Sequence, residues 1–243
     1  MQKHQPVLID QAFPIPGTPD VQTAVSEQLY LPENAQSCPL IVRAADFDDL
    51  SGEIRALNAA GYAVYVCFAP QKEMERDEDA CRAWLEQLNK KLGALLQKHP
   101  QLDEARMGVD GWIAAYVIFH TNRFCAAVQR PALINPATAY GNCAAGYAER
   151  FGDSLQDMMC RLAQKSVLKD VDSCRTPCLV VWQAGEKRYS REQSEQLYAA
   201  MKDRNPEIPC RMTVFTEIQW QKYALNELTC WWRRFLAKEA QHE

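Results

Sequence analysis

Apolar positions along the chain follow two different periods, which together predict an alternation of strands and helices. Residues 62–68 are apolar throughout, which is typical of a strand buried on both faces of a parallel sheet. Residues 77–98 instead repeat apolar side chains at helical spacing, so we predict a long amphipathic helix that ends before Pro100. Between residues 106 and 124 the pattern predicts a short buried strand, a turn at Gly111 and an apolar helix.

The same alternation continues toward both ends of the chain and predicts the fold class. Because βα units in series build a parallel sheet covered by helices, we predict one α/β domain over residues 1–243, with a mostly parallel central sheet and helices on both faces. A length of 243 residues is sufficient for one sizeable core. Further strands are expected at 6–10, 25–31, 39–42, 126–128, 178–181 and 210–215, and further helices at 47–60, 153–165, 190–204 and 223–238.

Composition and charge argue against several classes of function. The formal net charge of −4 leaves no basic excess that would attract nucleic acid. The sequence has no run of about 18 or more apolar residues, and the segment from Met1 to Pro6 lacks the apolar core of a signal peptide. We therefore expect a cytoplasmic protein that binds neither nucleic acid nor membrane, and we expect no cofactor.

The 10 cysteines are scattered along the chain rather than grouped. Cys174 and Cys178 form the one close pair, with C-x₃-C spacing but neither a second pair nor a histidine nearby. Buried, reduced thiols that pack as small hydrophobic side chains explain this distribution better than a zinc site. We therefore expect no metal site.

Several sequence motifs resemble one known family. Residues 106–109 read R-M-G-V, and residues 120–128 read H-T-N-R-F-C-A-A-V. These segments resemble the catalytic domain of the prolyl oligopeptidase family, where R-[LIM]-G-V precedes the serine turn and H-T-D-R-F-x-A-A-V closes the helix after it. The resemblance covers roughly residues 20–240. It implies an α/β-hydrolase fold and, in an active member, a hydrolase of the peptidase or esterase type.

The resemblance implies a nucleophilic serine in a G-x-S-x-G turn, and this chain has none there. The corresponding stretch is Asp110, Gly111, Trp112 and Ile113, and several residues are missing before residues 120–124. Serines elsewhere fall in predicted caps, connectors or helices, and a cysteine nucleophile would still need a cationic activator and an oxyanion hole. The thiols nearest the relevant loops are Cys125 and Cys143, and neither is expected to serve.

The acid and base positions that the resemblance implies are also altered. The base should lie between the last strand and the last helix, where Gln219 stands instead of histidine, and a carboxamide cannot accept a proton at neutral pH. Glu186 falls at the acid position, either as a relic that could orient an imidazole or as a surface carboxylate near Arg188. None of the four histidines lies in the base loop; they are His4, His99, His120 and His242.

The resemblance further implies a glycine-rich loop that contributes to the oxyanion hole. Here residues 39–42 continue into Arg43 and an acidic stretch, with no glycine until Gly52. Aspartates facing a developing oxyanion would repel it, so this loop opposes acyl transfer. Asp46 is instead predicted to cap the helix that follows.

The remaining expectations concern Trp112 and the adjacent pair Trp231 and Trp232. Trp112 either plugs the former oxyanion and nucleophile pocket, stacks on a ligand or fills core volume. The candidate pocket consists of Trp112, Glu186, Arg188 and Gln219. Trp231 and Trp232 are adjacent on a predicted helix and are expected to point in different directions. One indole would then lie at an interface, which is the basis for expecting a homodimer.

Together these observations predict a catalytically inactive, prolyl oligopeptidase-like α/β-hydrolase that serves as a binding or regulatory module for a peptide or protein partner. The alternative is an active serine hydrolase with a non-standard site or one shared between subunits. A structural subunit without a ligand is a third hypothesis.

Overall fold

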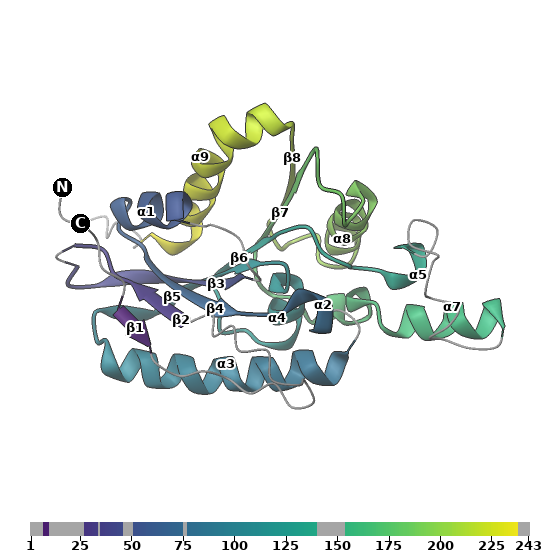
Figure 1. Cartoon of the computed structure of the whole chain (residues 1–243), viewed down its shortest axis with the longest axis horizontal. Helices are drawn as coiled ribbons and strands as arrows, with labels where there is room; N and C mark the ends of the chain where they lie inside the picture. Colours follow the sequence, from purple (N-terminus) through teal and green to yellow (C-terminus); the bar gives the residue numbers. More distant parts are fainter. Residues whose placement is uncertain are drawn as a thin grey trace.

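The computed structural model describes residues 7–9, 27–33, 35–45, 51–74, 77–139 and 154–237, and the strands within them form a single eight-stranded sheet (Figure 1). The strand order is β1-β2-β4-β3-β5-β6-β7-β8. The strands are β1 (Val7–Ile9), β2 (Glu27–Tyr30), β3 (Cys38–Ala45), β4 (Ala63–Phe68), β5 (Leu102–Gly111), β6 (Ala126–Gln129), β7 (Cys178–Gln183) and β8 (Cys210–Phe215). The helices are α1 (Ser51–Ala59), α2 (Gln71–Met74), α3 (Glu78–Lys98), α4 (Ala114–His120), α5 (Pro136–Ala139), α7 (Leu155–Gln164), the 3₁₀ helix η2 (Val167–Ser173), α8 (Arg191–Arg204) and α9 (Glu217–Leu236).

The sheet is parallel except at one edge. β1 pairs antiparallel with β2 and β2 antiparallel with β4, whereas each neighbouring pair from β4 to β8 is parallel. Helices α1 and α9 cover one face of the sheet, and α3, α4 and α8 cover the other (Figure 1). The predicted mostly parallel sheet with helices on both faces is therefore confirmed.

Helix α3 shows how the sequence pattern produces this packing. The Asp77 carboxylate accepts hydrogen bonds from the backbone N–H groups of Asp79 (3.0 Å) and Ala80 (3.2 Å), so two donors that the helix itself cannot satisfy are paired. The apolar stripe of the helix then faces the sheet. Its buried residues are Cys81, Leu85, Leu88, Leu92 and Leu95.

Helix α9 begins earlier than the sequence predicted and buries both of its adjacent tryptophans. Thr216 and Gln219 form a capping box, which starts the helix at Glu217 rather than near Tyr223. Trp231 and Trp232 are 6% and 0% exposed, so the prediction that one of them lies at an interface is wrong. Both fit because the helix crosses the sheet closely: a Cβ on Gly108 would lie 2.5 Å from the Trp232 ring.

Two further predictions can be compared only with the described part of the chain. Helix α1 is described from Ser51, so the predicted cap at Asp46 lies outside the described part of the chain. Within the described residues, no helix combines the length and apolar character that crossing a membrane requires.

Candidate functional site

The turn after β5 lies at the carboxyl edge of the sheet, where ligands bind in open α/β folds. Gly111 ends the strand with φ +151°, and a Cβ added to it would lie 2.3 Å from the Ala44 carbonyl oxygen. Only glycine tolerates both constraints. Trp112 and Ile113 complete the turn, and α4 begins at Ala114, as the strand-turn-helix prediction required.

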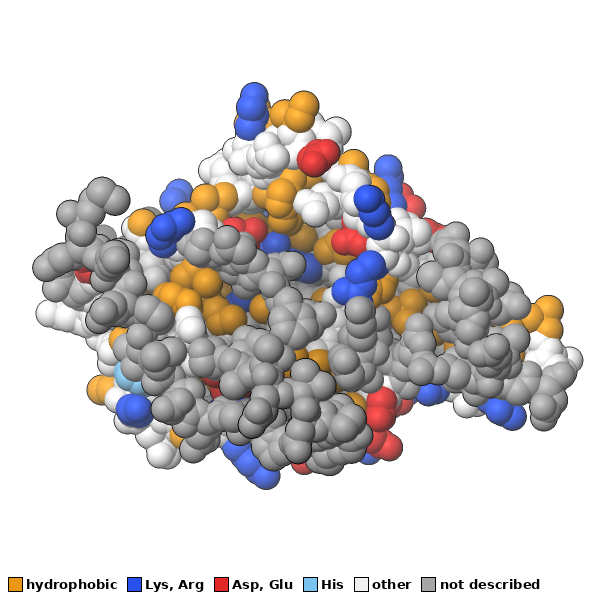
Figure 2. All heavy atoms as spheres, viewed as in Figure 1, with side chains coloured by type: hydrophobic (Ala, Val, Ile, Leu, Met, Phe, Trp, Pro, Cys, Tyr) orange, Lys and Arg blue, Asp and Glu red, His pale blue; other side chains and the backbone are white. Residues whose placement is uncertain are grey.

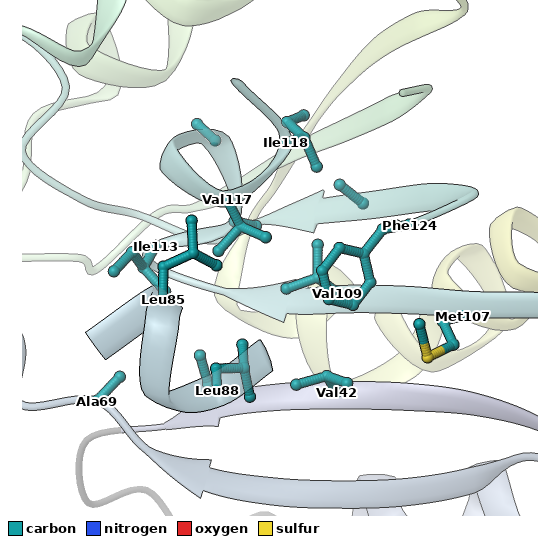
Figure 3. Close-up of a cluster of buried hydrophobic side chains, with 14 of the residues drawn as sticks. Val42, Ala69, Leu85, Leu88, Met107, Val109, Ile113, Val117, Ile118 and Phe124 are labelled. Atoms are coloured by element: carbon teal, nitrogen blue, oxygen red, sulfur yellow. The ribbon is translucent and has the colours of Figure 1, made fainter. Parts of the chain in front are cut away.

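Ile113 is the last residue of this turn before α4. When Gly111 is set on the first glycine of G-x-S-x-G, the serine position falls on Ile113. Its backbone (φ −94°, ψ 2°) has the conformation of the third residue of an ordinary tight turn, without a left-handed residue. Its side chain is 2% exposed and lies in the core cluster with Leu85 and Val117 (Figure 3).

Gln129, which the sequence analysis did not single out, fixes this turn from the end of β6. Its side-chain oxygen accepts a hydrogen bond from the Ala115 N–H at 2.6 Å, and its amide nitrogen donates to the Trp112 carbonyl at 2.6 Å. One free N–H of the first turn of α4 is thereby paired within the protein. The only sequence signal was a polar residue at the end of an apolar strand.

Four charged side chains, two of them buried and two partly buried, join the strand ends around the turn. Arg43 on β3 and Arg130 after β6 both contact Asp110 on β5 and Glu53 on α1. Arg130 Nε lies 2.8 Å from Asp110 Oδ1, Arg130 Nη2 lies 2.7 Å from Glu53 Oε2, and Arg43 Nη2 lies 3.3 Å from the same Glu53 oxygen. The Asp110 side chain is 1% exposed and that of Arg43 is 7% exposed. We call these residues the four-charge cluster.

The electrostatics of the four-charge cluster follow from this geometry. Burial alone would raise the pKa of Asp110, but the adjacent Arg130 and Arg43 outweigh it and hold that pKa below its ordinary value. Burial, with the neighbouring Arg130 charge, lowers the pKa of Arg43. Asp110 is therefore ionised at neutral pH, and the guanidinium groups beside it balance its charge. Because both Asp110 oxygens accept hydrogen bonds from arginines, Asp110 is not placed to act as a base.

Gln219 and Glu186 have local roles in the structure. Gln219 is exposed and its side-chain oxygen accepts from the Thr216 N–H at 2.9 Å, which completes the cap of α9. Glu186 follows the turn after β7, and its Oε1 accepts from the Arg188 N–H at 2.6 Å. The guanidinium of Arg188 lies over the Tyr189 ring, 5.1 Å from its centre.

A cavity of about 70 Å³ opens beside the turn. The side chain of Trp112 lines it and is held by a hydrogen bond from Nε1 to the Ala69 carbonyl at 2.9 Å. Trp112 is the member of the predicted pocket found in this wall, while Glu186, Arg188 and Gln219 are not part of it. The apolar part of the wall comes from residues that follow β4, β5 and β6 and from η2; it includes Met74, Trp112, Ile113, Ala132, Ile134 and Val167.

Charged groups stand at the rim of this cavity and are paired within the protein. Lys169 Nζ lies 2.5 Å from Glu78 Oε2. Asp170 Oδ2 lies 3.4 Å from Nε2 of His120, whose Nδ1 is 2.8 Å from the Tyr116 carbonyl. The recorded contacts of the His120 ring are thus with a carboxylate, a backbone carbonyl and the Tyr116 ring, and not with a hydroxyl or thiol.

Cys174 and Cys178 are buried, whereas Cys160 and Cys230 are exposed. Burial raises the pKa of both Cys174 and Cys178, which keeps these groups in the thiol form. Cys125 donates to the Ala105 carbonyl at 3.0 Å, and Cys143 lies outside the described residues. In the described ranges, no cluster of three histidine, cysteine or acidic side chains is arranged to hold a metal ion.

Three comparisons show which known proteins this chain is similar to. No protein-family model matches the chain. The uncharacterized peptidase YuxL of Bacillus subtilis is 29% identical over 116 residues, which is 44% of this chain and 18% of that protein. Among solved structures, an acylaminoacyl peptidase of Pyrococcus horikoshii matches with a TM-score of 0.69 and 14% identity, over 90% of this chain and 40% of that chain.

A smaller enzyme with the same fold matches over most of both chains. An esterase of Pyrococcus furiosus has a TM-score of 0.61 and 14% identity, over 87% of this chain and 86% of its own. The chain thus spans less than half of the peptidases that it matches and nearly all of the esterase. The strand order, the parallel core and these structural neighbours show that the chain has an α/β-hydrolase fold.

Proposed function

We propose that this chain is a non-hydrolytic α/β-hydrolase that acts as a binding or regulatory module for a peptide or protein partner. The observation that carries the proposal is the buried Ile113, which fills the nucleophile position with an aliphatic side chain. A covalent acyl intermediate requires a nucleophile that reaches the substrate, and Ile113 offers neither a reactive atom nor an exposed one.

The other parts of acyl transfer point the same way. Gln219 caps a helix and cannot take up a proton, so a general base is missing from the position after β8. Arg43 stands where the resemblance implies an oxyanion loop, but its charge is already neutralised by Asp110 and Glu53. An oxyanion hole needs donors that are free to face the developing charge. These three differences arise in separate segments, and each acts on a different part of the reaction.

The cavity beside Trp112 supports a role in binding. By the same measure of volume, a single water occupies about 10–15 Å³. A cavity of about 70 Å³ therefore accommodates one apolar group of side-chain size. Its apolar wall and charged rim fit a peptide segment that inserts one aliphatic side chain and keeps its polar backbone near the rim. We therefore propose a peptide with a leucine, valine or methionine side chain as the ligand.

Two measurements test the proposal. The purified chain should leave p-nitrophenyl esters and aminoacyl amides unhydrolysed and should not react with a fluorophosphonate probe. Turnover that is lost in Glu186→Gln would contradict the proposal and favour the alternative of a rearranged catalytic site. Probe labelling of a serine would favour the same alternative.

Binding is tested separately with blocked tripeptides that carry leucine or aspartate at the central position. The leucine peptide should bind more tightly by calorimetry, and Ile134→Trp, which fills the cavity, should abolish the difference. Leu225→Trp is the matched control, because Leu225 is exposed on α9 and is not part of the cavity wall. Equal binding of both peptides to the unmodified chain would contradict the proposed ligand. Absence of binding by both would favour the third hypothesis, a structural subunit without a ligand.

A further inference from the structure

The outer edge of β8 is open among the described residues. β8 is the last strand of the sheet, and its recorded ladder is with β7 alone (Figure 1). It lies between α8, which packs on one face of the sheet, and α9, which packs on the other. An edge strand of this kind presents unpaired backbone donors and acceptors that can pair with another strand.

The ladder with β7 identifies which backbone groups are open. Cys178 N–H donates to the Pro209 carbonyl at 3.0 Å, and Ala184 N–H donates to the Phe215 carbonyl at 2.7 Å. Because the bonding residues of a parallel strand alternate, the odd-numbered residues from 209 to 215 face β7. The N–H and C=O groups of Cys210, Met212 and Val214 therefore point away from the sheet.

We propose that this edge pairs with β8 of a second copy of the chain, in an antiparallel arrangement with a two-fold axis at Met212. In this register Met212 faces Met212 of the second copy, and Cys210 faces Val214 of the second copy. All outward backbone groups of the three residues then pair, because outward-facing residues lie opposite each other in an antiparallel ladder. The interface is isologous, as a closed dimer requires.

Charge complementarity supports a second copy as the partner and selects this register. The Arg211 side chain is 62% exposed, and its Nη2 lies 3.1 Å from Glu227 Oε1 on α9. Thr213 lies beside the same carboxylate, with Oγ1 3.3 Å from Glu227 Oε1. In the proposed register Arg211 lies opposite Thr213 of the second copy, and so next to that copy's Glu227. A register centred on Arg211 would instead set two arginines directly opposite each other, which is destabilising.

Exposed apolar side chains flank the same edge. Val214 on β8 is 38% exposed, and Tyr223 is 56% exposed one turn before Glu227 on α9. Residues four apart on a helix share a face, so Tyr223 and Glu227 point to the same side of α9. Figure 2 shows hydrophobic side chains at the surface where α9 begins. Side chains alternate along a strand, so Val214 faces the side of α8 with Cys210 and Met212, and Tyr223 lies on the side of α9. Pairing of the two β8 strands would cover part of the apolar surface on each side.

A proline at the axis tests the backbone pairing. Met212→Pro removes one outward N–H and leaves the bonds to β7, which use the neighbouring residues. Met212→Ala is the matched control, since it shortens the same side chain but keeps the N–H. Sedimentation velocity of the unmodified chain and of Met212→Ala should give twice the 27.7 kDa mass of one chain, and Met212→Pro should give a single chain with an unchanged circular dichroism spectrum.

A charge exchange tests the register without altering the backbone. If Met212→Pro fails to fold, the charge exchange still tests whether the two β8 strands pair. Arg211→Glu should raise the dimer Kd at least about tenfold, because it sets carboxylates against carboxylates. Adding Glu227→Arg should restore the Kd, since both Arg–Glu contacts are re-formed in reverse. The proposal is overturned if the unmodified chain remains a single chain up to about 1 mM, a limit beyond which an interface is too weak to matter. It is also overturned if a dimer survives both Met212→Pro and Arg211→Glu.

Discussion

Replacing Asp110 by asparagine removes one charge from the centre of the four-charge cluster while keeping the shape of the side chain. Asp110 is 1% exposed and both of its oxygens accept hydrogen bonds from arginines. In Asp110→Asn, the guanidinium groups of Arg43 and Arg130 keep Glu53 as their sole acidic partner within the cluster. An uncompensated positive charge is then left among buried side chains.

The size of the effect follows from the contact distances. Unit charges about 4 Å apart attract by about 4 kcal/mol at an effective dielectric constant of about 20, and Asp110 has two such partners. The burial penalty of the carboxylate offsets part of this attraction. Removing one partner of a buried ion pair typically costs about 3–5 kcal/mol, and we expect Asp110→Asn to lower the free energy of unfolding by that amount.

Urea unfolding followed by tryptophan fluorescence measures this change. The urea concentration at the midpoint should fall, while the dependence of the free energy of unfolding on urea concentration should stay the same. Asp172→Asn is the matched control, because Asp172 pairs with Arg204 at 2.7 Å but both side chains are more than half exposed. The control should change stability only slightly, since solvent screens an exposed pair. A loss of less than about 1 kcal/mol in Asp110→Asn would refute the reasoning, because the cluster would then behave as a surface ion pair.

The same variant predicts a pH dependence with a definite sign. The pKa of Asp110 is lower in the folded chain than its ordinary value, so the folded state favours the ionised carboxylate. The stabilisation is therefore fully present above the ordinary value of about 3.9 and is lost as the pH falls through the lower folded value. The difference in stability between the unmodified chain and Asp110→Asn should be constant near neutral pH and shrink in acid below about pH 4.

Three further predictions concern the turn after β5. Gly111→Ala should lower the free energy of unfolding by about 2–4 kcal/mol, because the φ of +151° and the nearby Ala44 carbonyl both oppose a side chain. The control Gly52→Ala, in α1, should be neutral or stabilising in the same urea assay. Gln129→Ala should cost about 1–3 kcal/mol, since three backbone groups lose their side-chain partner. A smaller loss measured by urea unfolding would mean that water replaces the amide. Ile113→Ser should remain unreactive toward a fluorophosphonate probe, and labelling at that serine would show that a base and an oxyanion hole are still present.

The sequence predicted the fold well because its signals were local and redundant. The uninterrupted apolar run at 62–68 and the helical spacing at 77–98 became β4 and α3, and Gly111 became the turn after β5. The start of α9 was missed because Thr216 and Gln219 form a capping box, and Gln219 had been assigned by its place in a resemblance rather than by its own hydrogen bonds. Local capping chemistry was sufficient to explain that residue.

The arrangement around the candidate site was harder to predict, because it depends on contacts between distant segments. Arg43, Asp110 and Arg130 come from three strand ends that are far apart in sequence, and nothing in their neighbours indicates that they meet. The same holds for Trp232, whose burial requires the missing side chain of Gly108 on a different element. Spacing rules describe one helix or strand, and these contacts are set by how the elements cross.

The proposed lack of hydrolysis would also explain why Ile113→Ser alone should not produce a reactive serine. An acyl-transfer site keeps unpaired donors and a reactive side chain at the carboxyl edge of the sheet, and such groups reduce stability. Here the same strand ends are joined by Arg43, Asp110 and Arg130, and the turn is closed by Gln129. An oxyanion at this edge would compete with these contacts, so acyl transfer here would require several coordinated substitutions and the loss of ion pairs of the four-charge cluster. A binding role places no such demand on these residues, since the cavity beside Trp112 lies next to them and leaves their contacts intact.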